Sequence, residues 1–329
     1  MKATWFAAAI GMAISTTGAA STVIPTSYEA GHFFTTPTTL GGKTLRFNTD
    51  TGGGGGFLLL RASVAATMHL TPARCFDTDG FVIPPTFAPG KGIPHLDGLP
   101  CNNVALVPDG IGDGMDDGVV SAWYLSRGIW TFDYPAHRLT LEDASWKHDA
   151  KARAVPLGFP TKPNGDLEAP YPRIAISVEG ESFDLLLDTG ATAHPTATGK
   201  KLMGTPVAQN GYAATSYITS SVMNRWHAAH PDWPLVDDAD DLFGQGRATR
   251  AIRVPSITLQ GWSVGPVWFT ERADKAFSMQ GLSAYMDKQV HGALGGNVLS
   301  SFRMTIDYAH RTAWLLCADC QLQPQVSRP

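Results

Sequence analysis

An internal repeat constrains the fold of this 329-residue chain more than any other feature of its sequence. The tripeptide Asp-Thr-Gly occurs at residues 50–52 and again 138 positions later, at residues 188–190. A glycine turn between two strand-like runs precedes each copy, at residues 40–43 and 178–181, with the same offset. The repeat therefore predicts that each half of the chain contains the same strand-turn-strand unit, which ends in an aspartate.

A second set of matching segments follows the two tripeptides. Residues 118–120 and 130–134 match residues 292–294 and 304–308, and both matches have an offset of 174 positions. Four features that recur in the same order with only two offsets predict a tandem of two related lobes. The later glycine turns consist of Gly118, Val119 and Val120 in the first lobe and of Gly292, Ala293 and Leu294 in the second.

The boundary between the lobes falls in a segment rich in Lys, Pro, Gly and Asp that follows Trp146. We place it near residues 147–153, so that the first lobe spans residues 21–147 and the second spans residues 148–329. The increase in offset from 138 to 174 means that the second lobe carries 36 additional residues between its aspartate and its later glycine turn. Part of this excess should follow Ala193.

Composition favours short strands over a helical bundle. The chain has 34 Gly and 23 Pro, and runs of Val, Ile, Thr and aromatic residues lie between turn residues. We therefore predict an all-β fold with a few short helices, two of them near residues 62–69 and 218–230, the second closed by Pro231. Lys and Arg number 25 against 29 Asp and Glu, without a basic stripe, so we expect no nucleic-acid binding.

Residues 1–20 are typical of a signal peptide. Lys2 precedes an apolar stretch, residues 3–14, and small residues stand at the −3 and −1 positions of a cut before Ser21. A membrane anchor is the alternative, but the apolar stretch is shorter than the roughly twenty residues that a transmembrane helix needs. We therefore expect a mature protein that is exported, periplasmic or secreted, without membrane insertion.

All four cysteines, Cys75, Cys101, Cys317 and Cys320, lie in the mature chain, and export to an oxidising compartment makes disulfides their natural use. Four cysteines allow three connectivities, and the sequence alone does not choose among them. Proximity favours pairing Cys75 with Cys101 and Cys317 with Cys320. The Cys-x-x-Cys spacing of the second pair also occurs in redox and zinc sites, but no second such motif accompanies it.

The chemistry of the repeat resides in its two aspartates. Each lies at the tip of a sharp turn, where a glycine permits close approach of another chain segment. Two such turns from two pseudo-symmetric lobes would bring Asp50 and Asp188 face to face. Two adjacent carboxylates cannot both ionise, so one keeps a proton, and the pair can hold a water molecule as base and acid at once.

The segment from Leu186 to Thr192 and the later turn at residues 292–295, together with residues 306–308, resemble motifs of pepsin-like and retropepsin-like aspartic proteases. The likeness is greatest to the secreted bacterial bilobal type and covers residues 23–316. It implies two pseudo-symmetric β-barrel lobes with a cleft between them. It also implies an aspartic endopeptidase that uses no metal or cofactor and acts on peptide or protein substrates, and we expect a monomer.

The resemblance assigns roles to individual residues as well. It implies Asp50 and Asp188 as the catalytic dyad, between which a water molecule is activated to attack a peptide carbonyl. It implies that Thr51 and Thr189 cross-link the two turns beneath the dyad. The remaining active-site support consists of Gly52, Gly53, Gly190, Ala191 and Thr192.

The first lobe departs from the family pattern at three places. Asn48 and Thr49 replace the apolar pair that normally precedes the first aspartate. Gly53 stands where pepsin-like enzymes carry a hydroxyl that touches the carboxylate, and Ser121 replaces the last glycine of the later turn. These departures leave an alternative open: an exported bilobal protein that binds peptides or other ligands and has lost catalysis.

Further expectations concern the surroundings of the site. The excess after Ala193 could form a lid around residues 205–217. We expect no removable pro-segment, because residues 23–25 would form the first strand of the folded lobe. The acidic loop at residues 109–114 lacks two calcium ligands, and the two histidines of the helix at 218–230 have no metal-binding partners, so we predict no metal site.

Overall fold

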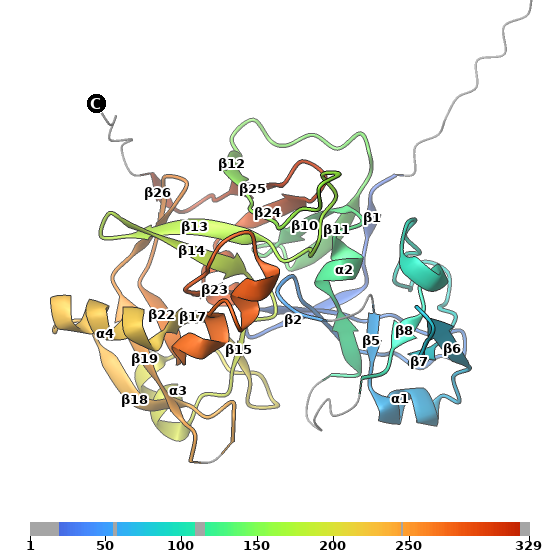
Figure 1. Ribbon diagram of the computed structural model, residues 1–329, viewed down its shortest axis with the longest axis horizontal. Helices are drawn as coiled ribbons and strands as arrows, with labels where there is room; N and C mark the ends of the chain where they lie inside the picture. The colour runs from blue at the N-terminus through green and yellow to red at the C-terminus, as the bar shows by residue number, and fades with distance from the viewer. Residues whose placement is uncertain (1–19, 55–57, 109–115, 245, 323–329) are drawn as a thin grey trace, which may run out of the picture.

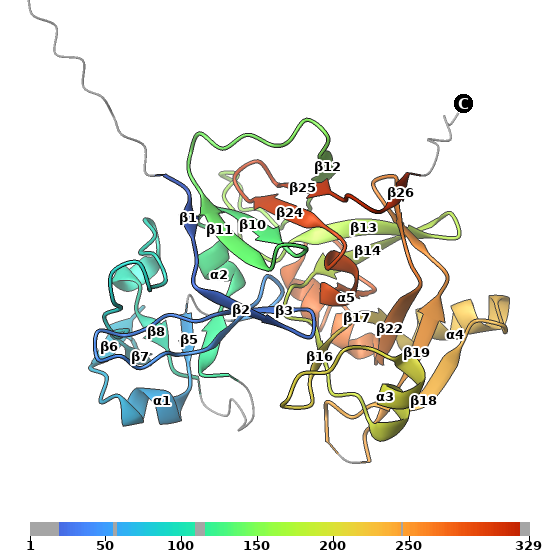
Figure 2. The same ribbon diagram turned by 180° about the vertical axis from the view of Figure 1, so that it is seen from behind.

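The computed structural model describes residues 20–54, 58–108, 116–244 and 246–322. Strands dominate it, in three large sheets and one two-stranded sheet, with short helices beside them (Figure 1, and from behind in Figure 2). The prediction of a mostly β fold with a few short helices is therefore confirmed. The predicted signal peptide lies, except for its last residue, outside the described residues and stays a prediction.

An eight-stranded sheet forms most of the first lobe. Its strands follow the order β2-β3-β4-β9-β5-β8-β7-β6, and β4 and β9 are parallel neighbours in its interior. This pair matters for the site because Asp50 directly follows β4. The strand bounds are β2 (Thr26–Glu29), β3 (His32–Thr35), β4 (Phe47–Thr49), β5 (Leu58–Leu60), β6 (Pro72–Cys75), β7 (Thr78–Val82), β8 (Ala105–Leu106) and β9 (Gly118–Val120).

A ten-stranded sheet in the second lobe repeats this topology. In it, β14 lies parallel to β23 and β17 antiparallel to β23, as β4 and β5 lie beside β9 in the first lobe. Its order is β18-β19-β22-β17-β23-β14-β13-β20-β21-β26. The bounds are β13 (Arg173–Val178), β14 (Glu181–Leu187), β17 (Ser216–Thr219), β18 (Leu235–Asp240), β19 (Thr249–Val254), β20 (Ile257–Leu259), β21 (Trp262–Val264), β22 (Val267–Arg272), β23 (Gly292–Leu294) and β26 (Gln321–Leu322).

A six-stranded sheet, order β1-β11-β10-β24-β25-β12, joins the two lobes. Its central strands β10 and β24 are antiparallel and pair Thr131 with Thr305, residues 174 positions apart. The two hydroxyl oxygens lie 2.8 Å apart, so this pair marks the pseudo-twofold axis that the repeat predicts. The bounds are β1 (Thr22–Val23), β10 (Ile129–Asp133), β11 (Arg138–Glu142), β12 (Arg153–Pro156), β24 (Arg303–Asp307) and β25 (Thr312–Leu316).

Short helices follow equivalent strands in the two lobes. The two helices expected near residues 62–69 and 218–230 are present as α1 (Ala62–Thr67), after β5, and α4 (Ser220–Ala229), after β17. α4 buries Val222, Met223 and Trp226, as its apolar spacing predicts. The other helices are α2 (Ala122–Leu125), α3 (Ala197–Met203), α5 (Gly296–Leu299), η1 (Pro100–Asn102), η2 (Asp274–Phe277) and η3 (Leu282–Tyr285).

The start of the described chain is part of the folded first lobe. β1 pairs with β11, and the main-chain N–H of Ile24 donates a hydrogen bond to the Leu139 carbonyl at 2.9 Å. Ile24 is buried in a core cluster that includes residues from both lobes. The expectation that residues 23–25 form a first strand is therefore confirmed for Val23, the last residue of β1, with Ile24 continuing its pairing.

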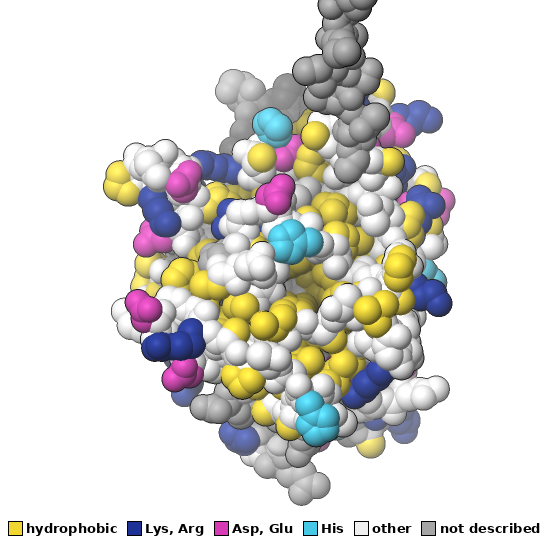
Figure 3. All heavy atoms as spheres, turned by 90° about the vertical axis from the view of Figure 1, so that its right-hand side faces the viewer, with side chains coloured by type: hydrophobic (Ala, Val, Ile, Leu, Met, Phe, Trp, Pro, Cys, Tyr) yellow, Lys and Arg dark blue, Asp and Glu magenta, His cyan; other side chains and the backbone are white. Residues whose placement is uncertain are grey.

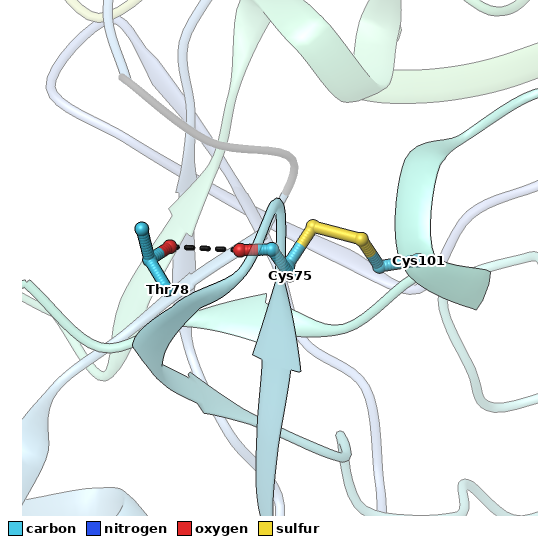
Figure 4. The surroundings of a disulfide bond; sticks show 3 residues. All are labelled: Cys75, Thr78 and Cys101. Atoms are coloured by element: carbon cyan, nitrogen blue, oxygen red, sulfur yellow. Dashed lines mark hydrogen bonds between the residues drawn. A yellow bond between two sulfur atoms is a disulfide. The ribbon is translucent and has the colours of Figure 1, made fainter.

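Two disulfides link the cysteines as proximity suggests. Cys75, at the end of β6, is bonded to Cys101, and Cys317 is bonded to Cys320; the Cα atoms are 5.6 Å apart in both pairs. Figure 4 shows the first bond, with the Thr78 hydroxyl donating to the Cys75 carbonyl at 2.7 Å. This disulfide ties the β6–β7 hairpin to the segment that leads into β8.

The segment expected to form a lid, residues 205–217, is instead built into the sheets at its C-terminal end. Ala213 and Ala214 form β16, which pairs with β15 (Thr192–Ala193), and residues 216 and 217 begin β17. Ala213 and Ser216 are fully buried. The preceding turn contacts the first lobe, since the N–H of Gln209 donates to Glu29 Oε1 at 2.9 Å. The lid assignment is therefore wrong for residues 213–217, because the insertion supplies structural strands.

The outer face of the first lobe carries apolar side chains toward its middle and charged side chains of both signs toward its edges (Figure 3). Lys and Arg side chains and Asp and Glu side chains both occur around this rim. None of the helices in the described part of the chain is long and apolar enough to cross a bilayer.

Candidate active site

The first candidate catalytic carboxylate is positioned by a pair of parallel strands. Asp50 directly follows β4, and its main-chain N–H donates to the Val120 carbonyl at the end of β9, at 2.9 Å. Gly118 at the start of β9 has no room for a side chain, since a Cβ there would lie 1.9 Å from the Leu59 carbonyl oxygen. The later glycine turn thus allows β5, β9 and β4 to lie together and hold the aspartate at their edge.

The second carboxylate is held in the same way. The N–H of Asp188 donates to the Leu294 carbonyl at 2.9 Å, and a Cβ on Gly292 would lie 2.0 Å from the Tyr217 carbonyl oxygen. Ala293 and Leu294 pair with the last residues of β14, as Val119 and Val120 pair with β4. The residues that the repeat singled out therefore occupy equivalent positions around both aspartates.

A network of four hydrogen bonds joins the two aspartate turns. The hydroxyl of Thr51 accepts from the N–H of Thr189 at 3.0 Å and donates to the Leu187 carbonyl at 2.7 Å. The hydroxyl of Thr189 accepts from the N–H of Thr51 at 3.1 Å and donates to the Thr49 carbonyl at 2.7 Å. Both threonines are buried, so these reciprocal bonds fix one turn against the other.

Each turn brings its glycine against the carboxylate of the opposite lobe. A Cβ on Gly52 would lie 2.4 Å from Cγ of Asp188, and a Cβ on Gly190 would lie 2.4 Å from Cγ of Asp50. The N–H of each glycine donates to the aspartate of its own turn, at 2.7 Å for Gly52 and 2.9 Å for Gly190. Glycine at both positions lets the two carboxyl groups approach to hydrogen-bonding contact.

The electrostatics of the pair favour one retained proton. Burial raises the pKa of Asp188 well above its ordinary value, and the adjacent charge of Asp50 raises it further. Burial also raises the pKa of Asp50, against the opposing effect of main-chain N–H donors. Two close carboxyl groups titrate as a unit, and the arrangement therefore binds one proton more tightly than an isolated aspartate does.

The glycine at position 53 has a geometric reason. A Cβ there would lie 2.2 Å from Oδ2 of Asp50, so the main chain passes too close to the carboxylate for any side chain. Its N–H takes part in holding that carboxylate. Gly54 has a φ of +91°, and a Cβ on it would lie 2.4 Å from Cβ of Ser121, which is fully buried. The replacement of glycine by Ser121 therefore fits with the absence of a side chain at residue 54.

Asn48 lies on β4, two residues before Asp50, which directly follows the strand. Side chains two positions apart point to one face of a strand, so Asn48 lies on the face that carries the aspartate. It is buried, and its Oδ1 atom has no hydrogen-bond partner among the described residues. The equivalent residue of the second lobe, Leu186, packs in an apolar cluster with Phe277 and Met286.

Two contacts between the lobes were not foreseen from the sequence. Nε2 of His32 lies 3.1 Å from the Ala191 carbonyl oxygen and 3.2 Å from the Thr192 hydroxyl. Since a carbonyl only accepts, Nε2 carries the proton, and burial lowers the pKa of this imidazole to about 4. The Tyr171 hydroxyl donates to the Gly54 carbonyl at 2.9 Å. Each active-site loop is thus contacted by the other lobe.

No group of three or more His, Cys, Asp or Glu side chains within the described ranges is arranged to bind a metal ion. The two aspartates are held by main-chain donors and by each other. What the site offers chemically is therefore a carboxyl pair, half-buried on the Asp50 side, that can exchange a proton with a bound molecule.

Comparisons with known proteins give little beyond this geometry. No protein-family model matches the chain, and no curated protein matches its sequence. Among solved structures, it is similar to the aspartic proteinase from Irpex lacteus, with 12% sequence identity and a TM-score of 0.44, over 91% of this chain and 98% of that one. The function of this chain has to follow from its own residues.

Proposed function

We propose that this protein is an aspartic endopeptidase with Asp50 and Asp188 as its catalytic pair. The observation that carries the proposal is the reciprocal placement of each glycine beneath the carboxyl group of the other lobe. The four threonine hydrogen bonds and the raised pKa values of both carboxyl groups support it. A structural role alone would not require two acidic groups to be buried side by side.

The proposed mechanism uses the two protonation states of the pair. The ionised carboxylate removes a proton from a water molecule as its oxygen attacks the peptide carbonyl carbon, and the protonated carboxyl group donates its proton to the carbonyl oxygen. In the resulting tetrahedral gem-diol, the C–N bond breaks as the nitrogen takes a proton from one carboxyl group. A hydroxyl proton returns to the pair, which releases a carboxylic acid and an amine and restores its single shared proton.

The substitutions Asp50→Asn and Asp188→Asn test the proposal. An amide is nearly isosteric with a carboxyl group but cannot act as the base, so we expect each variant to fold and to lose about 10²–10⁴-fold of its activity. Cleavage of an unfolded protein at acidic pH measures this, and a statine-type transition-state analogue should inhibit the wild type. The matched control is Asp166→Asn, the same change at an exposed loop residue.

The outcomes separate the proposal from its alternative. Near wild-type turnover by either asparagine variant would remove that aspartate from the site. A wild-type protein that binds the analogue but cleaves no peptide bond under any condition would instead be the exported binding protein. Retention of the analogue by both asparagine variants would place its binding elsewhere in the molecule.

The remaining assignments accompany this proposal. Two disulfides and the core position of Ile24 fit an exported protein whose folded part begins near Ser21. We propose a monomer of two lobes, residues 21–147 and 148–329, that acts on peptides or unfolded proteins. N-terminal analysis of the exported protein tests the cleavage position, with a terminus beyond about residue 34 contradicting it.

A further inference from the structure

Tyr217, in the centre of the second-lobe sheet, contacts the active-site loop through its hydroxyl group. The hydroxyl accepts a hydrogen bond from the N–H of Thr192 at 2.6 Å and donates one to the carbonyl of the same residue at 2.5 Å. Burial raises the pKa of Tyr217 to about 12, so the group keeps the proton that it donates. One side chain thus holds both main-chain polar groups of a residue four positions after Asp188.

A buried ion pair supports Tyr217 from the adjacent strand. The guanidinium carbon of Arg272 lies 4.1 Å from the centre of the Tyr217 ring, and Nη2 donates to the Thr192 carbonyl at 3.3 Å. Nη1 lies 2.8 Å from Oδ2 of Asp240, and the two side chains are only 5% and 2% exposed. The other oxygen of Asp240 accepts from the N–H of His194 at 2.7 Å.

A buried ion pair needs a reason other than stability. The cost of removing two charges from water commonly cancels their attraction, and well-packed apolar residues would often serve the fold as well. Here the pair fixes a guanidinium group against the tyrosine ring and the loop carbonyl at the same time. Its geometry therefore serves orientation of Thr192 more than adhesion between strands.

The described residues at the equivalent positions of the first lobe do not form such an arrangement. Leu59 pairs with Val119 as Tyr217 pairs with Ala293, so the hydroxyl is replaced by an aliphatic side chain. Gly54 is 138 positions before Thr192, and its carbonyl is held by a tyrosine of the opposite lobe. The two loops are therefore held differently: a tyrosine of its own lobe bonds to the main chain of Thr192, whereas a tyrosine of the opposite lobe bonds to the carbonyl of Gly54.

We propose that Tyr217 is a positioning residue for Asp188, and that the Arg272–Asp240 pair keeps its hydroxyl on the main chain of Thr192. The N–H donor of Gly190, two residues before Thr192, can point at the Asp188 carboxyl group only while this short segment keeps its path. Loss of the hydrogen bonds from Tyr217 to Thr192 lets the segment move and weakens the alignment of the Asp188 carboxyl group. This inference rests on the proposed endopeptidase function.

The test compares Tyr217→Phe with Tyr28→Phe, which makes the same change on β2, where the ring stacks on His137 at 4.1 Å. We expect Tyr217→Phe, which removes both hydrogen bonds to Thr192, to lower kcat about tenfold, with KM within about twofold of wild type. The concentration of active sites is counted with the statine-type analogue, which separates lost alignment from partial unfolding. Tyr28→Phe should keep both constants.

A second readout does not depend on catalysis. Amide hydrogen exchange, followed by mass spectrometry in peptides that contain residues 189–193, should become faster in Tyr217→Phe and stay unchanged in Tyr28→Phe. The double variant Arg272→Met with Asp240→Asn removes both charges and retains the oxygen that caps His194. It should unfold near the wild-type temperature, while its kcat and exchange change in the direction of Tyr217→Phe.

The two readouts distinguish failure of this inference from failure of the proposed function. If the wild type cleaves no peptide, the endopeptidase proposal fails and the exchange data still decide whether Tyr217 holds the loop. If the wild type is active and Tyr217→Phe matches it in kcat, the inference is overturned. Unchanged exchange in the loop peptides overturns it as well, whatever the rates.

Discussion

Two pairs of threonines join the lobes. When both members of a pair are replaced by valine, we expect one pair to regain the stability lost in the single variants and the other pair not to regain it. Valine matches threonine in shape and removes only the hydroxyl group. Thr131 and Thr305 bond only to each other among the described residues, hydroxyl to hydroxyl. Thr51 and Thr189 bond instead to main-chain groups of the opposite turn.

The magnitudes follow from what each valine leaves unpaired. Thr189→Val leaves the N–H of Thr51 and the carbonyl of Thr49 without partners, at about 1–3 kcal/mol for each buried group, or roughly 2–6 kcal/mol in all. Thr131→Val leaves only the Thr305 hydroxyl unpaired, at about 1–3 kcal/mol. The double variant of Thr131 and Thr305 removes both hydroxyls and should regain most of this loss, because two methyl groups then face each other.

The double variant of Thr51 and Thr189 should regain nothing. Its four main-chain groups remain buried whatever the side chains are, so the two losses add or exceed the sum. Urea unfolding of both sets, with equal slopes checked first, gives the two coupling free energies. A Thr131/Thr305 double variant no more stable than its single variants would refute the reasoning, and so would recovery of stability in the Thr51/Thr189 double variant.

Three further changes test the site and its support. Asp188→Asn should raise the melting temperature at pH 7 more than at pH 4. An aspartate with a raised folded-state pKa contributes stability below its unfolded pKa of about 3.9, and this contribution is lost as the pH rises through the folded-state pKa. An equal change of melting temperature at both pH values contradicts this. Gly53→Ala places a Cβ 2.2 Å from the Asp50 carboxylate, so peptide cleavage should fall about 100-fold in a folded protein, and an active variant would disprove the close approach. Replacing Cys75 and Cys101 by serine should lower the free energy of unfolding in urea by about 3.5 kcal/mol, because this disulfide joins residues 26 positions apart. The C-terminal disulfide joins residues 3 positions apart, so its loss should cost about 1.5 kcal/mol. Equal losses of stability would contradict a loop-entropy origin.

Spacing made the general architecture predictable. The repeat of Asp50 at Asp188 and of Gly118 at Gly292 carries the topology of both lobes, because a turn glycine and a strand end cannot shift without breaking the parallel pairing. Proximity in the sequence correctly predicted the disulfides, because the two cysteines of each pair are at most 26 positions apart. Short-range and periodic signals are what a single sequence expresses.

The contacts that His32 and Tyr171 make with the opposite lobe were out of reach for the same reason. His32 and Tyr171 touch loops 159 and 117 positions away, and neither stands in a pattern that marks it. The expected lid failed because an insertion can form either a loop or internal strands. Its alanines at positions 213 and 214 are small enough to pack between strands, yet small residues are equally common in exposed loops.

The central pairing of β10 with β24 has a consequence for the ancestry of the fold. Thr131 pairs with its counterpart Thr305 across antiparallel strands, so the two lobes contact each other here through equivalent strands. This is the geometry of an isologous interface between two identical subunits. A single half of the chain contains all that such a homodimer would need at this contact. Away from this contact the two lobes need not match each other, and the equivalent positions Leu59 and Tyr217 carry different side chains.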